Sequence, residues 1–138
     1  METKIYKEDK VVTCINCITG KTEELIFQGD RLTRITETES SEKNNPFIGP
    51  GLIDLQVNGI NGIDFNNPSL TREDIVKATH FLLSKGITTF FPTIITNSDK
   101  NILEIVRTIY MACISDAIVN DCMPCKLYEQ YPGCFYLN

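Results

Sequence analysis

The feature of this sequence that most constrains its fold is the alternation of strand-like and helix-like segments between residues 52 and 113. Residues 52–57 and 87–91 are short and mostly apolar or β-branched, which is typical of strands. Each is followed by a loop and then by residues at helical spacing. One face of the two helices is lined by Ile75, Val76, Thr79, Leu82 and Leu83, and then by Ile102, Val106, Ile109 and Cys113. This repeated β-loop-α order predicts a parallel sheet covered by helices, in the α/β class.

Local signals give the expected ends of these elements. Thr71 and Asp74 have the spacing of a capping box at the start of the first helix. Gly86 stands where the cap at the helix C-terminus belongs, and the second helix is expected to begin near Ser98. Residues 58–69, rich in Asn and Gly, predict a loop between the first strand and the first helix.

The first forty residues predict β structure. Residues 11–18 read as one strand, and residues 24–28 and 31–35 read as a hairpin joined by Gly29-Asp30. Residues 36–46 are polar and end on proline, so we expect a linker there.

These segments predict two domains. Residues 1–48 would form part of a small N-terminal β domain with its linker, and residues 49–138 the first two to three β/α units of a larger domain. Two such units do not distinguish a doubly wound sheet from a (β/α)8 barrel, and a barrel needs about 250 residues. The expected fold is therefore incomplete, with unpaired sheet edges that favour aggregation or dependence on a partner.

Charge and hydropathy exclude several classes of function. The chain of 138 residues has a net charge of -5 and scattered basic residues, which argues against nucleic-acid binding. It has no apolar run near the roughly 20 residues of a membrane helix, and residues 1–10 do not resemble a secretory signal. We therefore expect a cytoplasmic protein without a membrane partner.

The sequence contains two C-x-x-C pairs, a spacing that is found in zinc sites. Cys14 and Cys17 lie on an expected strand, three positions apart, so their thiols would point to opposite faces. Cys122 and Cys125 follow about a hundred residues later, well beyond the spacing of usual zinc ribbons. We expect no zinc site from these pairs.

The candidate functional residues are polar side chains at the end of the strand at 52–57. Alternation would place Asp54, Gln56 and Asn58 on one face and Ile53, Leu55 and Val57 on the other, against helices. In α/β barrels the C-terminal ends of the strands carry the active site. The alternative is that Asp54 and Asn58 only cap the following loop.

The residues around this strand carry a family resemblance. Residues 50–59 (Pro-Gly-Leu-Ile-Asp-Leu-Gln-Val-Asn-Gly) resemble the first-strand motif of the amidohydrolase superfamily, in which most members have His-x-His. Here the pair is Gln56-x-Asn58, which is similar to the single-metal branch of the N-acetylglucosamine-6-phosphate deacetylases. Residues 59–66 and 86–96 resemble the continuation in the same family. The resemblance implies the start of a (β/α)8, TIM-like barrel preceded by a small β domain.

The resemblance also implies an activity. Family members hydrolyse the acetamide of N-acetylglucosamine 6-phosphate to glucosamine 6-phosphate and acetate, in amino-sugar catabolism, and are commonly homo-oligomers. One divalent metal, a zinc-like ion or iron, activates water, and an aspartate shuttles the proton. Gln56 and Asn58 are neutral amides and weak metal ligands, so they would hydrogen-bond a water molecule or the substrate.

The sequence departs from this family in two places. The chain has one histidine, His80, which falls within the first helix and is expected to have a surface or packing role; the family's two histidine ligands and its catalytic aspartate find no counterparts. The third-strand pattern His-x-Glu-Gly-Pro-Phe is not recovered, and Glu129 is the one carboxylate near the metal-binding position, with a solvated carboxylate as the alternative. The tail 124–138 reads as aberrant, as if the reading frame or the gene had been altered shortly after Met123.

Three interpretations follow. The chain could be the N-terminal part of a metal-dependent deacetylase, inactive and without bound metal on its own. It could belong to another amidohydrolase, or it could be a non-catalytic stub or binding module from a disrupted gene.

Overall fold

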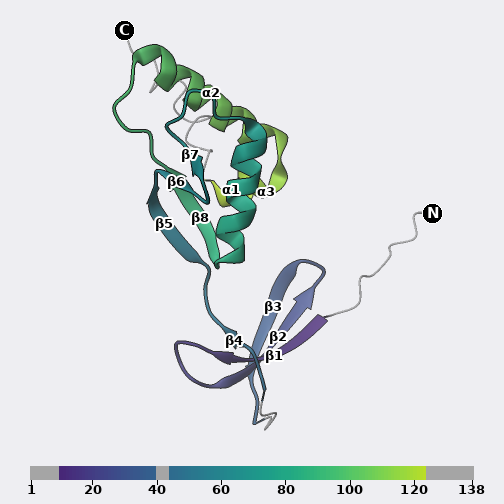
Figure 1. Ribbon diagram of the computed structural model, residues 1–138. Helices are drawn as coiled ribbons and strands as arrows, with labels where there is room; N and C mark the ends of the chain where they lie inside the picture. The colour runs from purple at the N-terminus through teal and green to yellow at the C-terminus, as the bar shows by residue number, and fades with distance from the viewer. Residues whose placement is uncertain (1–9, 40–43, 124–138) are drawn as a thin grey trace, which may run out of the picture. The chain divides into compact units, whose positions relative to one another are not determined.

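The computed structural model describes residues 10–39 and 44–123, and the chain divides into two compact units, Met1–Pro50 and Gly51–Asn138 (Figure 1). Both sheet and helix are present, so the predicted mixed α/β class is confirmed. Across the described residues, no helix is long and apolar enough to cross a membrane.

The first unit contains a four-stranded sheet with strand order β3-β2-β1-β4. Its strands are β1 (Lys10–Asn16), β2 (Thr22–Gln28), β3 (Arg31–Glu37) and β4 (Phe47–Ile48). The predicted hairpin is confirmed: β2 and β3 are antiparallel, and Gly29 in their turn has a φ of 62°, which glycine adopts without steric cost.

The predicted linker at 36–46 is partly wrong. Thr36 and Glu37 extend β3, where they pair with Glu24 and Glu23. All seven residues of β3 are exposed, so their polarity does not distinguish an exposed strand from a loop.

The two thiols of the first C-x-x-C lie in different environments, but not because both are on one strand as predicted: β1 ends at Asn16, and Cys17 lies in the turn that follows. Cys14 is buried and its Sγ donates to the carbonyl oxygen of Glu23 at 3.5 Å, whereas Cys17 is exposed. Burial, with a smaller effect from Glu23, raises the pKa of the Cys14 thiol. Cys14 therefore behaves as a small neutral core residue.

The second unit is built around two parallel strands, β5 (Leu52–Val57) and β8 (Ile87–Pro92), which pair with each other. The crossover between them contains α1 (Arg72–Ser84), and β8 is followed by α2 (Asp99–Ser115) and α3 (Ala117–Cys122). Helices α1 and α3 contact β8, and α2 packs on both helices. The predicted β-loop-α-β-loop-α order is confirmed (Figure 1).

The predicted loop at 58–69 contains a small hairpin of β6 (Gly59–Ile60) and β7 (Ile63–Asp64). Its turn residues Asn61 and Gly62 have φ values of 52° and 80°. Positive φ at both central residues is the geometry for which Asn-Gly is favoured. The dipeptide, flanked by isoleucines, was the sequence signal for this hairpin.

Helix α1 is capped as the sequence predicts. The Thr71 hydroxyl oxygen accepts from the Asp74 backbone N–H at 3.2 Å, while the Asp74 carboxylate accepts from the Thr71 backbone N–H and hydroxyl at 3.2 and 2.7 Å. At the other end, Lys85 is the C-cap and Gly86 follows with a φ of 81°.

Helix α3, which the sequence did not predict, begins directly after α2. The Asp116 carboxylate caps it by accepting from the backbone N–H groups of Ile118 and Val119.

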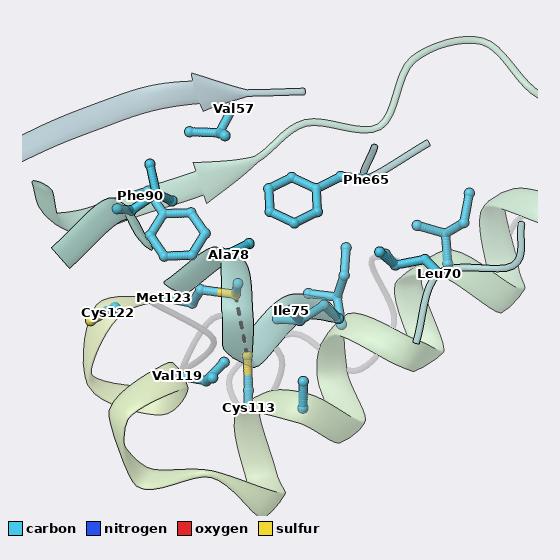
Figure 2. Close-up of a cluster of buried hydrophobic side chains, with 14 residues drawn as sticks. Val57, Phe65, Leu70, Ile75, Ala78, Phe90, Cys113, Val119, Cys122 and Met123 are labelled. Atoms are coloured by element: carbon cyan, nitrogen blue, oxygen red, sulfur yellow. Dashed lines mark hydrogen bonds between the residues drawn. The ribbon is translucent and has the colours of Figure 1, made fainter. Parts of the chain in front are cut away.

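One hydrophobic core joins the strands and helices of the second unit (Figure 2). At its centre, the rings of Phe65 and Phe90 stack with centroids 6.3 Å apart and planes 10° apart, and both are fully buried. The sulfur atoms of Cys113 and Met123 lie 3.7 Å apart, below these rings in Figure 2.

Cys122, from the second C-x-x-C, is buried in the same core, and this burial raises the pKa of its thiol. Cys125, the other cysteine of this pair, belongs to the tail 124–138, which lies outside the described residues.

Replacing Phe90 with alanine should lower the free energy of unfolding of the second unit by about 3–5 kcal/mol, because it removes a buried ring and the stack on Phe65. Denaturant unfolding followed by far-UV circular dichroism measures this. Phe81→Ala is the matched control: Phe81 is only partly buried and carries Lys85 over its ring at 5.2 Å, so its loss should cost about 1 kcal/mol. Equal costs for the two variants would contradict the core described here.

Acidification should destabilise α1 through Asp74. The hydrogen bonds from the Thr71 hydroxyl and backbone N–H hold the pKa of the Asp74 carboxyl below its ordinary value. A carboxyl with a lowered pKa in the folded state contributes stability above its unfolded pKa of about 4, and this is lost as the pH falls through the folded value. The thermal midpoint should therefore fall between about pH 5 and pH 2, and less steeply in Asp74→Asn and in Thr71→Val. An unchanged slope in both variants would exclude this contribution.

Candidate functional site

The candidate site lies at the C-terminal edge of the β5–β8 pair. Because the strands are parallel, both end at the same edge. The Thr93 backbone N–H donates to the Val57 carbonyl oxygen at 2.8 Å, which adds a last rung beyond the strands. The chain after β5 enters the β6–β7 hairpin, and the chain after β8 runs toward α2.

A bulge in β5 corrects the predicted alternation. Asp54 pairs with Phe90 and Val57 pairs with Pro92, with a register shift between them. Paired residues on neighbouring strands point to the same side of a sheet, so Asp54 lies on the helix-covered face together with Val57. The prediction that Asp54 shares a face with Gln56 and Asn58 is therefore wrong.

The same bulge exposes two apolar residues that were expected to pack against helices. Ile53 and Leu55 are 63% and 75% exposed, whereas Val57 is 5% exposed. Since the extra residue reverses the alternation, Ile53 and Leu55 lie on the open face of the sheet with Gln56 and Asn58. A bulge often re-aims side chains near functional sites.

The Asp54 carboxylate holds this bulge. It accepts a hydrogen bond from the Gln56 backbone N–H at 3.0 Å, which closes a local turn over the extra residue. Gln56 and Asn58 themselves are exposed. The structure thus gives Asp54 a local contact of its own and leaves the two amides available on the open face.

Asn66 is a further residue at this edge, and its role was missed by the sequence analysis. It is 9% exposed, and its carboxamide contacts three backbone groups from both strand ends. The Nδ2 atom donates to the carbonyl oxygens of Asn58 at 3.4 Å and Thr93 at 3.2 Å, and the Oδ1 atom accepts from the Ile95 N–H at 2.6 Å. The one local indication that Asn66 is buried was its position next to the apolar Phe65. That indication does not identify the backbone groups to which its side chain hydrogen-bonds.

The described residues do not supply a metal site. Within residues 10–39 and 44–123, no group of three or more His, Cys, Asp or Glu side chains lies close enough together to hold a metal ion. His80 is exposed on α1, as expected for a surface residue. Glu129, the predicted candidate ligand, lies outside the described residues. The donor set at the described edge, with two neutral amides, therefore does not fit the metal that the family resemblance implies.

Comparison with known proteins finds N-acetylglucosamine-6-phosphate deacetylases among the relatives of this chain. The N-acetylglucosamine-6-phosphate deacetylase of Haemophilus influenzae is 35% identical over 91 residues, which is 65% of this chain and 23% of the relative. The chain resembles N-acetylglucosamine-6-phosphate deacetylase. It spans about a quarter of the length of that curated relative. No protein-family model matches the sequence.

Solved structures of the same enzyme share the fold of this chain. The deacetylase of Pasteurella multocida covers 78% of this chain with a TM-score of 0.58 and 22% identity, over 31% of its own length. A mutant deacetylase of Mycobacterium smegmatis, in complex with N-acetyl-D-glucosamine-6-phosphate, covers 79% with a TM-score of 0.61 and 18% identity, over 30% of its own length. At these identities the likeness concerns the fold.

Removing the Asp54 carboxylate should loosen the bulge without unfolding the sheet. In Asp54→Ala the Gln56 amide loses its acceptor, so its hydrogen exchange should accelerate by about tenfold, the worth of one hydrogen bond to a charged group. Asp54→Asn keeps an acceptor oxygen in place and should change exchange much less. An unchanged exchange rate in Asp54→Ala would show that the carboxylate does not hold the bulge. The measurement is amide exchange by NMR.

Proposed function

We propose that this chain is the N-terminal part of a cytoplasmic, metal-dependent N-acetylglucosamine-6-phosphate deacetylase. Residues 1–48 would belong to its small β domain, and residues 49–138 would open its (β/α)8 barrel. The observation that carries the proposal is the parallel β5–β8 pair, whose shared C-terminal edge presents Gln56 and Asn58. This is the edge at which barrel enzymes build their active sites.

In this proposal Gln56 and Asn58 bind the substrate or the attacking water through hydrogen bonds. Each carboxamide offers two N–H donors and one acceptor oxygen, which suits sugar hydroxyls and an acetamide. Asp54 contributes indirectly, because its carboxylate fixes the backbone N–H of Gln56. The bulge then keeps Gln56 on the open face.

The divalent metal of this enzyme class would polarise the acetamide carbonyl and activate water when bound. The described residues of this chain do not include a ligand set for it, so no step of the reaction is assigned to them. We infer that the chain alone has no deacetylase activity and acts, at most, in binding.

Titration of the isotope-labelled chain with N-acetylglucosamine 6-phosphate tests the proposal. The side-chain amide signals of Gln56 and Asn58 should shift, and Gln56→Leu should weaken binding by about tenfold, the worth of one or two hydrogen bonds. Gln28→Leu, at an exposed glutamine of β2, is the matched control and should bind as the parent does. Glucosamine 6-phosphate, which lacks the acetamide, should bind more weakly.

An acetate-release assay on the same preparation, with added Zn²⁺ or Fe²⁺, should give no turnover above the blank. Turnover would contradict the inference of inactivity. Equal binding of the acetylated and free amino sugars would contradict recognition of the acetamide, and shifts confined to other residues would favour a different binding module.

A further inference from the structure

We propose that Asn66 is a positioning residue for the candidate site, because its carboxamide fastens the end of β5 to the segment that follows β8. The proposal rests on the function proposed above, since the surface that Asn66 would position is the edge carrying Gln56 and Asn58. Its structural part, however, can be tested without any ligand.

Asn66 lies where the ladder between the two strands stops. The last rung joins the Thr93 N–H to the Val57 carbonyl. Beyond it, the carbonyls of Asn58 and Thr93 are bridged by the Asn66 Nδ2 atom, at 3.4 and 3.2 Å. The side-chain amide therefore replaces a backbone rung at the point where the strands separate.

The Asn66 Oδ1 atom completes the link, because it accepts from the Ile95 N–H at 2.6 Å. The Thr93 carbonyl thus accepts from the carboxamide and the Ile95 N–H donates to it. A neighbouring strand would pair with the same two backbone groups. A primary amide is the side-chain group that offers two donors and an acceptor in one plane. Aspartate has the same shape but, when ionised, offers acceptors alone.

Further contacts hold Asn66 itself in place. Its backbone N–H donates to the Asp64 carboxylate at 2.8 Å, and its carbonyl oxygen accepts from the Asn97 Nδ2 atom at 3.3 Å. The preceding residue, Phe65, is anchored by its stack on Phe90 and donates its N–H to the Asn58 carbonyl at 2.9 Å. A side chain with its backbone fixed on both sides can position its neighbours at little cost in conformational entropy.

Asn66→Asp tests this arrangement with an almost isosteric change. The ionised carboxylate faces the carbonyls of Asn58 and Thr93 and has no proton to donate to them, so both hydrogen bonds are lost and the oxygens repel one another. This repulsion separates the strand ends, although aspartate retains an acceptor for the Ile95 N–H. The protection of the Ile95 and Phe65 amides against hydrogen exchange should fall by about 10- to 100-fold, whereas amides in the middle of α1 should be protected as before. Asn67→Asp is the matched control: Asn67 is exposed, its side-chain oxygen accepts from the Ser69 N–H, and aspartate preserves that bond.

The pH dependence of Ile95 protection in Asn66→Asp distinguishes the loss of these hydrogen bonds from a general loss of packing, which would not depend on pH in this way. In Asn66→Asp the carboxyl is buried between two carbonyls and near the Asp64 carboxylate, so its pKa should be raised. The protonated form keeps one donor. Protection of Ile95, corrected for the intrinsic exchange rate, should therefore be partly retained at about pH 4 and be lost as the pH rises through the raised pKa.

The link to function is tested with N-acetylglucosamine 6-phosphate as the probe. The shifts that it causes at the side-chain amides of Gln56 and Asn58 should shrink in Asn66→Asp and persist in Asn67→Asp. If the parent chain does not bind the probe, the proposed function fails while the exchange data still decide whether Asn66 joins the strand ends. If the exchange changes but binding does not, Asn66 is structural only and the positioning role is overturned.

A milder variant covers the case in which Asn66→Asp unfolds the unit. Asn97→Asp removes the Nδ2 donor to the Asn66 carbonyl and keeps the acceptor used by Ser98 and Asn101. It should lower the protection of Ile95 by a smaller factor, about threefold, with α1 unchanged. Equal protection of Ile95 in the parent and in Asn97→Asp would then overturn the proposal.

Discussion

The packing of Phe65 against Phe90 is the contact on which the second unit depends. Phe65 follows the β6–β7 hairpin and Phe90 lies within β8, so their stack joins the crossover segment to the sheet. A pair of parallel strands is not stable by itself and needs an apolar cover. The two rings and the buried residues of α1, α2 and α3 provide that cover on one face, and the open face is left to Gln56, Asn58 and the exposed residues of β5.

Polar contacts then fix what packing leaves undetermined. Hydrophobic burial is non-directional, so the Phe65–Phe90 stack does not by itself set the direction in which the strand ends leave the sheet. That direction is set by the Asp54 carboxylate within β5 and by the Asn66 carboxamide between the strand ends. Both residues act on backbone groups rather than on other side chains. These hydrogen bonds fix the backbone that carries the exposed amides of Gln56 and Asn58. The position of side chains in a binding site depends on how firmly that backbone is held.

The sequence predicted the parts of the fold that depend on local rules. The capping box of Thr71 and Asp74, the core face of α1 and the Gly29 turn follow from spacing and side-chain type, and the structure contains them. The face of α2 was predicted only in part: Ile109 and Cys113 are buried, but Ile105 and Ala112 accompany them in place of the partly buried Ile102 and Val106. The bulge at Asp54 was not predictable by alternation, since one inserted residue reverses the side of every residue after it. The role of Asn66 was not predictable either, because its partners Thr93 and Ile95 are about thirty positions away in sequence. The Asn61-Gly62 hairpin, in contrast, had a recognisable signal within a segment interpreted only as loop.

The crossover between β5 and β8 also bears on how the second unit folds. Leu52 pairs with Ile87 across about 35 positions of chain, so closing this loop is entropically costly before any strand pairing can compensate. Helix α1 shortens the effective loop, because its capping box favours an early helical turn and its thirteen residues then move as one body. The sheet should thus form late, after α1, and the relative contact order of the unit should place its folding rate among mixed α/β domains rather than among helical bundles.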